Sequence, residues 1–142
     1  ERARNETEGR FHSLAHLIDV PALERTYRRA RKDAAVGVDG VTKDAYGKDL
    51  GGNLAGLHER MKSKRYRHQP IRRVHIPKGN GKTRPIGVCA FEDKLIQDAL
   101  REVLEAIYEQ DFLDCSYGFR PGRSAHDAVR TLDGIAHRNQ VN

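Results

Sequence analysis

One stretch of this chain, residues 60–91, carries dense positive charge and no negative charge. It contains ten Lys and Arg residues and neither Asp nor Glu, whereas the whole chain has 26 basic and 20 acidic residues. The remaining residues therefore sum to a formal charge of −4, and the net +6 of the chain comes from this basic block. Like charge concentrated in this way destabilises a folded protein unless a polyanion neutralises it. The basic block therefore predicts binding to nucleic acid or to a nucleoside triphosphate.

Within the basic block, the apolar pattern between residues 71 and 89 predicts a β-hairpin. Apolar and polar side chains alternate on both sides of Gly79-Asn80-Gly81. Asn-Gly between two such runs is a strong hairpin signal, because both residues tolerate positive φ. Lys78, Lys82 and Arg84 then surround the turn, where ammonium and guanidinium groups suit phosphate oxygens. The alternative is an exposed hairpin that lysines keep soluble.

The sequence on either side of the hairpin has helical periodicity. We expect a helix within residues 13–32 that restarts with Asp19 as its cap, and a second helix that begins after Thr42. The most regular pattern predicts an amphipathic helix over residues 92–109, and a last helix follows Ser124. The fold class is therefore α+β and mostly helical.

The segment 116–123 is an irregular loop with two aromatic residues and two arginines. Tyr117 and Phe119 can stack on bases while Arg120 and Arg123 hold the phosphate backbone. The alternative is a structural turn in which Phe119 fills the core. The two interpretations are compatible.

Other chemistries lack a complete set of residues. Gly81-Lys82-Thr83 is no P-loop, because Ile76 stands where that motif needs glycine and a strand is predicted to follow. Carboxylates at helical spacing, such as Glu102 and Glu105, are expected on solvated faces without basic partners. We expect no catalytic centre and no metal site within this chain. No stretch has the apolar length of a membrane span, and the composition predicts a soluble, cytoplasmic protein with no membrane partner.

Four stretches of the chain resemble one protein family. Ile76–Gly87 looks like the fingers hairpin of group II intron-encoded reverse transcriptases, also called maturases, and Asp93–Leu100 resembles the helix that follows it. Ser116–His126, with its Gly-Phe-Arg-Pro-Gly-Arg-Ser run, is similar to the next family block, and Gly37–Thr42 matches the N-terminal extension. The resemblance runs in order over about residues 13–135.

The resemblance implies a domain organisation and an activity. Residues 1–10 would be a flexible N-terminus, 11–70 the helical N-terminal extension, and 71–142 the fingers hairpin, the long helix and the start of the palm. The longer parent would be an RNA-directed DNA polymerase that acts in reverse transcription, intron splicing and mobility. Its two Mg²⁺ ions would be held by palm aspartates that this chain lacks, so we expect the chain alone to be inactive.

The resemblance also assigns residues and partners. Lys78, Arg84 and Lys82 would contact the triphosphate of the incoming dNTP. Intron RNA, or an RNA template with its DNA primer, would lie on a set of cationic side chains: Lys62, Lys64, Arg65, Arg67, Arg72, Arg73, Arg120 and Arg123.

Two other functions remain open at the level of sequence. The first is a non-catalytic, maturase-type RNA-binding splicing cofactor. Residues 14–67 would then clamp structured RNA through the basic block together with a second cationic set: Arg25, Arg28, Arg29, Arg31 and Lys32. The second is self-association through uncovered apolar faces, which would give a homodimer.

Overall fold

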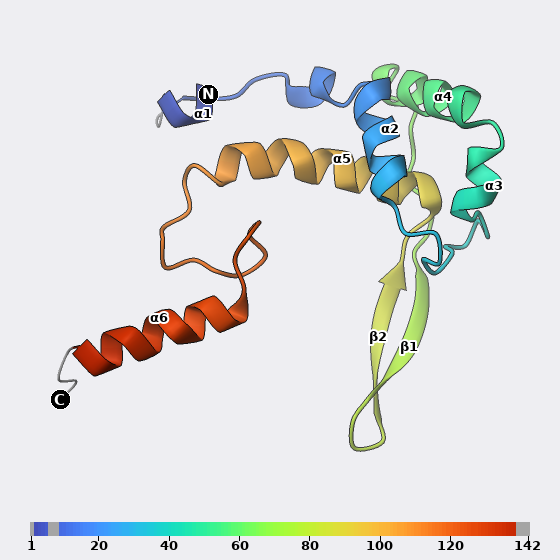
Figure 1. The fold of residues 1–142 in the computed structure, drawn as a ribbon. Helices are drawn as coiled ribbons and strands as arrows, with labels where there is room; N and C mark the ends of the chain where they lie inside the picture. Colours follow the sequence, from blue (N-terminus) through green and yellow to red (C-terminus); the bar gives the residue numbers. More distant parts are fainter. Residues whose placement is uncertain (1, 6–8, 139–142) are drawn as a thin grey trace. The chain divides into compact units, whose positions relative to one another are not determined.

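A computed structural model describes residues 2–5 and 9–138, and within them helices dominate (Figure 1). The helices are α1 (Arg2–Asn5), the 3₁₀ helix η1 (Leu14–Leu17), α2 (Val20–Arg29), α3 (Lys43–Gly47), α4 (Leu50–Lys62), α5 (Phe91–Tyr108) and α6 (Ala125–Arg138). Strands β1 (Arg72–Lys78) and β2 (Lys82–Val88) form one antiparallel sheet. The predicted α+β class is confirmed. Among the described residues, no helix is both long and apolar enough to cross a membrane.

The chain divides into two compact units. One unit is Phe11–Val103, and the other combines Glu1–Arg10 with Leu104–Asn142. The expected extension and the hairpin therefore lie in the same unit. The N-terminus, expected to be flexible, forms the helical turn α1 over the residues described there, and residues 1 and 6–8 lie outside the described part.

Side-chain caps set the helix starts as the sequence predicts. Asp19 Oδ1 accepts a hydrogen bond from Ala22 N (2.8 Å) at the start of α2, and Thr42 Oγ1 accepts one from Ala45 N (3.1 Å) in α3. The helix expected after Thr42 is in fact two helices. Asp49 begins the second of them, α4, by accepting from Gly52 N (3.2 Å), because a new cap satisfies the backbone donors of a new first turn.

The core of the unit Phe11–Val103 lies where α2, α3, α4 and the first half of α5 meet. Leu23, Leu57 and Leu95 are buried there. Tyr46 and Phe91 pack with their ring centroids 5.0 Å apart. Burying a leucine side chain contributes roughly 2 kcal/mol, so this cluster is the main source of stability in the unit.

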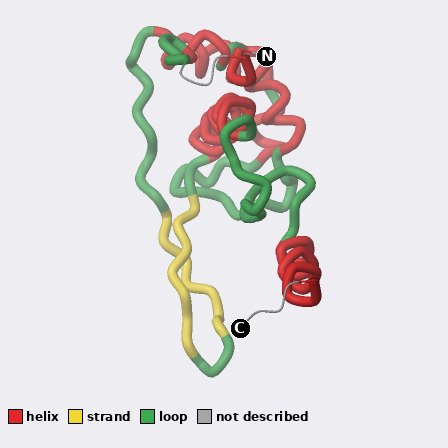
Figure 2. Tube along the Cα trace, turned by 90° about the vertical axis from the view of Figure 1, so that its left-hand side faces the viewer, coloured by secondary structure: helices red, strands yellow, loops and turns green. Residues whose placement is uncertain are grey.

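The hairpin is the least covered part of this unit. Its strands pair in register from Arg72 opposite Val88 to Lys78 opposite Lys82, and residues 79–81 form the turn. Asn80 (φ 62°) and Gly81 (φ 70°) adopt the positive φ that the sequence predicts. Figure 2 shows the two strands extending away from the helices of their unit.

The other unit exposes apolar side chains. Val129, Leu132 and Ile135 of α6 are at least half exposed. Phe119 is fully exposed at φ 58°, so the expectation that it fills a core is wrong for the described structure. Ser124 and Asp127 form the predicted reciprocal cap of α6, with Ser124 N donating to Asp127 Oδ2 (2.9 Å).

Candidate nucleic-acid and nucleotide interface

The three residues predicted to bind a nucleotide lie on one face of the hairpin tip. Side chains alternate between the faces of a strand, and directly opposed residues share a face. Lys78 is directly opposite Lys82, and Arg84, opposite Ile76, is two residues further along β2 on the same face. All three cations are exposed. The register therefore gathers three positive charges at one end of one face.

These charges have no intramolecular acceptor. Within residues 2–5 and 9–138, the side chains of Lys78, Lys82 and Arg84 make no hydrogen bond and no ion pair, and the same holds for the side chain of Arg73 on the opposite face. Like charges placed directly opposite each other in a sheet are destabilising. The hairpin tip therefore keeps an arrangement that costs free energy in the absence of an anion.

Arg60, the first cation of the basic block, pairs with Glu92 (2.6 Å), and within the described residues the remaining cations are either free or bonded to uncharged oxygen atoms. The ammonium groups of Lys62 and Lys64 are exposed and have no partner in the described part of the chain. Arg67 donates to two backbone oxygens close in sequence, the nearer being Tyr66 O at 2.9 Å, and Arg72 Nε donates to Val36 O (3.0 Å). Arg65 Nε donates to a serine hydroxyl two residues away (2.9 Å). Each of these three arginines remains exposed, so the block presents a continuous cationic segment before the hairpin.

Arg120, predicted to bind RNA, is turned inward. Its side chain is 6% exposed and pairs with Glu109 at 2.6 Å. It also donates to Leu113 O (2.9 Å) and Ser116 O (3.0 Å), and its guanidinium lies over the Phe112 ring. The Glu109 carboxylate raises the pKa of Arg120 further, mainly through this hydrogen bond. Arg120 therefore organises its own loop.

Arg123 is likewise engaged within its loop. It donates to the backbone oxygen of Asp114, pairs with the Asp114 carboxylate (3.3 Å), and stacks over Tyr117 with 5.4 Å between guanidinium and ring centroid. The structure thus does not bring Arg120 or Arg123 into the unit that holds the hairpin.

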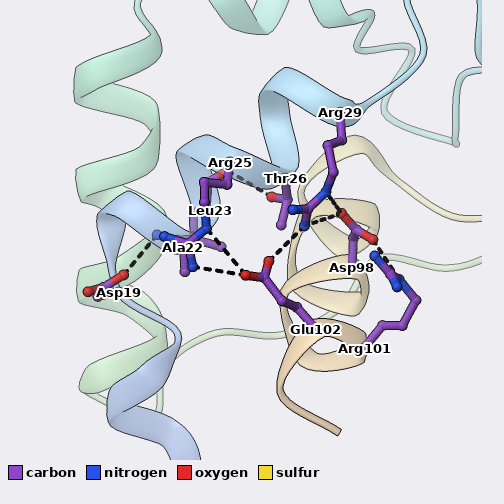
Figure 3. A network of polar contacts seen from close by, with 9 residues as sticks. All are labelled: Asp19, Ala22, Leu23, Arg25, Thr26, Arg29, Asp98, Arg101 and Glu102. Atoms are coloured by element: carbon purple, nitrogen blue, oxygen red, sulfur yellow. Dashed lines mark hydrogen bonds and ion pairs between the residues drawn. The ribbon is translucent and has the colours of Figure 1, made fainter. Parts of the chain in front are cut away.

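The helices α2, α3 and α4, with α5 up to Val103, form the helical body of this unit. Several of its cationic side chains pair with carboxylates of a neighbouring helix (Figure 3). Arg29 of α2 donates to Asp98 (2.9 Å) and Glu102 (2.8 Å) of α5, and Arg25 donates to Glu102 (3.1 Å). The expectation that Glu102 lacks a basic partner is therefore wrong, because α2 packs beside α5 and supplies two. The hydrogen bond from Arg29 outweighs the opposing effect of burial and lowers the pKa of Glu102.

The hairpin root contains three residues that sequence reasoning missed. Asp93, in the first turn of α5, is buried and accepts hydrogen bonds from Tyr66 Oη (2.5 Å) and Gln69 N (3.1 Å). Asp39 Oδ2 accepts from Phe91 N (3.1 Å), which makes Asp39 the cap of α5 from a distant loop. Burial, followed by the hydrogen bond to Asp93, raises the pKa of Tyr66.

One sequence signal could have found Asp93. It precedes Ile96 by three residues, so a carboxylate occupies the otherwise apolar face of the helix. Asp39 and Tyr66 carry no comparable signal, since their partners lie 52 and 27 residues away.

No metal site accompanies these residues. In the described part of the chain, no group of three or more His, Cys, Asp or Glu residues is placed to hold a metal ion.

Comparison with known proteins supplies relatives for part of the chain. No protein-family model matches it. The chain is 47% identical over 96 residues to protein YkfC of Escherichia coli (strain K12), an alignment that covers 68% of this chain and 25% of that protein. It is 52% identical over 73 residues to the group II intron-encoded protein LtrA of Lactococcus lactis subsp. cremoris, covering 51% of this chain and 12% of LtrA. Over 42 residues it is 45% identical to nuclear intron maturase 2, mitochondrial, of Arabidopsis thaliana, covering 30% of this chain and 6% of the maturase. The chain spans a quarter or less of the length of these relatives.

Proposed function

Because this chain is a homologue, over part of its length, of group II intron-encoded proteins and intron maturases, we propose that it is the nucleic-acid- and nucleotide-binding part of an intron-encoded reverse transcriptase. The relatives support this general class, and they extend well beyond the region that this chain matches. The longer protein would copy RNA into DNA and assist the splicing of its intron RNA.

The observation that carries this proposal is the uncompensated charge of the hairpin tip. Lys78 and Lys82 face each other on the face that also bears Arg84, and none of the three has an acceptor among the described residues. A triphosphate supplies several anionic oxygens within a short distance, and arginine can bind two of them at once. We assign these three side chains to the triphosphate of the incoming dNTP.

The remaining free charge favours single-stranded or intron RNA as the second ligand. Lys62, Lys64 and Arg73 have no acceptor in the described part of the chain, and Arg65, Arg67 and Arg72 keep exposed guanidinium groups while bonding locally. Phosphates spaced along an RNA strand match a cationic segment of this kind. Arg120 and Arg123 are left out of this assignment because intramolecular partners hold them.

A salt titration with the 142-residue chain tests the RNA assignment. If about five phosphates are contacted, a slope near −0.7 per contact predicts that affinity for a fluorescein-labelled single-stranded RNA falls roughly 100-fold between about 50 and 200 mM salt. Fluorescence anisotropy measures the dissociation constant at each salt concentration. A shallow dependence would show that the basic block does not engage phosphates and would refute the RNA assignment.

The name of one relative, an intron maturase, favours a second candidate, a splicing cofactor without polymerase activity. Arg84→Ala in the longer protein separates the two functions. As a polymerase residue, Arg84 stabilises charge on the triphosphate, and its loss lowers kcat/KM for dNTP by roughly 10²-fold in primer extension. Splicing assisted by the protein, with no measurable primer extension by the unaltered protein, would favour the cofactor.

A further inference from the structure

The direction in which the hairpin projects is set at its root. In the described chain no helix packs along either strand, and the strands contact chiefly each other. A two-stranded hairpin has little stability of its own in water. Whatever holds the segments that flank the strands therefore decides where Lys78, Lys82 and Arg84 lie.

The segment that leads into β1 is held by a buried carboxylate. Asp93 is 4% exposed, and each of its oxygens has a donor in that segment: Oδ1 accepts from Tyr66 Oη and Oδ2 from Gln69 N. A buried carboxylate is costly unless it is hydrogen-bonded. Displacing the leading segment would leave the carboxylate without these donors, so the packed body resists that displacement.

The segment that leaves β2 is held by separate contacts. Phe91 N donates to Asp39 Oδ2 (3.1 Å), and Gly37 packs so closely on Cys89 and Ala90 that an added Cβ would lie 2.6 Å from Ala90 Cα. Arg72 Nε donates to Val36 O at the first residue of β1. Hydrogen bonds and close packing thus hold both ends of the hairpin against the helical body. Asp93 is the buried charged side chain among these contacts.

We propose that Asp93, acting through Tyr66 and the Gln69 backbone, is a positioning residue that orients the hairpin for its anionic ligand. It contacts no ligand itself, because it is buried. The inference rests on the proposed function of the hairpin tip. In the described part of the chain, Asp93 makes no hydrogen bond and no ion pair with the proposed ligand-binding residues. It lies where α5 meets the segment that leads into β1, the strand that carries Lys78.

Two phenol deletions test this role with a matched control. Tyr66→Phe removes the donor to Asp93, and Tyr46→Phe removes an equivalent donor to Glu92 (3.3 Å), one residue earlier in α5. Both hydrogen bonds are part-buried, but only Tyr66 lies in the segment that leads into the hairpin. Each change deletes one oxygen and keeps the ring, so both variants should fold even where Asp93→Ala does not.

The measurement is the dissociation constant for a fluorescently labelled deoxynucleoside triphosphate at about 50 mM salt, with thermal unfolding recorded for each variant. Tyr66→Phe is expected to weaken binding roughly fivefold, the factor for one net hydrogen bond, and Tyr46→Phe by less than about twofold. The same two changes are repeated in a background with Lys78, Lys82 and Arg84 all replaced by alanine. In that background, Tyr66→Phe should not lower the affinity further, because a tip without its three charges no longer contributes to binding.

Each outcome decides the matter. Two results would overturn the positioning role but not the assignment of the tip. In the first, Tyr66→Phe lowers the affinity equally with and without the three tip charges. In the second, Tyr66→Phe and Tyr46→Phe lower the affinity equally, as expected if Tyr66 is only structural. Unchanged affinity in the triple-alanine chain would overturn the assignment of the tip as well. Coupling between Tyr66 and the tip, with similar unfolding temperatures for the two phenylalanine variants, would establish the positioning role.

Discussion

The hairpin and the helical body carry the same kinds of cation and use them in opposite ways. At the junction of α2 and α5, Arg25 and Arg29 donate to two carboxylates of α5. On the hairpin, Lys78 and Lys82 oppose each other with no acceptor in the described chain. Ion pairs of the body lower its own free energy, whereas unpaired like charge gains free energy only from a partner. Pairing within the molecule, rather than charge alone, thus separates structural cations from binding ones.

The loop around Arg120 sharpens this contrast. Its composition, two aromatics and two arginines, also predicts nucleic-acid binding. Yet Arg120 satisfies a carboxylate and two backbone oxygens of its own loop. A cationic residue type therefore marks a candidate, and its intramolecular partners decide between the two roles.

The largest expected effect comes from removing the charges of the hairpin tip. Replacing Lys78, Lys82 and Arg84 together by alanine should weaken binding of a fluorescently labelled deoxynucleoside triphosphate roughly 100-fold at low salt. Because these side chains have no internal partners, the unfolding temperature should not fall. Anisotropy titrations and thermal unfolding measure the two quantities.

The matched control removes equal charge from the body. Arg25→Ala, Arg28→Ala and Arg31→Ala together delete three cations that pair with Glu102, Glu24 and Asp33. This variant should lose stability and bind both the triphosphate and RNA nearly as well as the unaltered chain. A large loss of RNA affinity would instead support the clamp through the N-terminal helices and break the comparison.

A steric change at the boundary between the two regions should act on stability. An added Cβ at Gly37 would lie 2.6 to 2.7 Å from backbone atoms of Cys89 and Ala90, which cannot move aside cheaply. Gly37→Ala should therefore lower the free energy of unfolding by about 2 kcal/mol. Gly51→Ala, where nothing lies within 4 Å, is the control and should raise it by about 0.5 kcal/mol. Urea denaturation measures both, and equal effects would contradict the close packing.

A smaller effect concerns the acid sensitivity of the body. Folding lowers the pKa of Glu102 below its usual 4.5, because Arg29, and then Arg25, donate to the carboxylate. The stability gained in this way is present above that usual value and is lost as the pH falls through the folded pKa. Glu102→Gln should therefore cost about 0.5 kcal/mol near pH 7, as is typical of half-exposed pairs, and almost nothing near pH 3.

The RNA affinity of the same variant is the control for this pH effect. In the described structure Glu102 pairs with Arg25 and Arg29 and with none of the cations assigned to RNA, so Glu102→Gln should leave the RNA affinity at neutral pH unchanged. A stability difference that persists at about pH 3 would show that packing, and not the ion pair, is responsible.

Local sequence was sufficient for several elements. The Asn80-Gly81 turn, the Asp19 and Thr42 caps and the period of α5 were all predicted, because each depends on residues close together in the chain. The split of α3 from α4 was missed, because the pattern around Asp49 fits either one helix with two glycines or a new cap. The sequence also predicts that Lys78, Lys82 and Arg84 surround this turn, and the register that follows from the turn places them on one face.

Tertiary structure alone decided which charges are free. The partners of Arg29 and Tyr66 lie 69 and 27 residues away, and no local pattern specifies such distances. The inward position of Arg120 depends likewise on how its loop folds back on Glu109. The sequence by itself thus determined where the positive charge accumulates and which turn presents it, since both depend on neighbouring residues. Packing decided which charges are neutralised, because an ion pair forms only where the fold brings its two ends together.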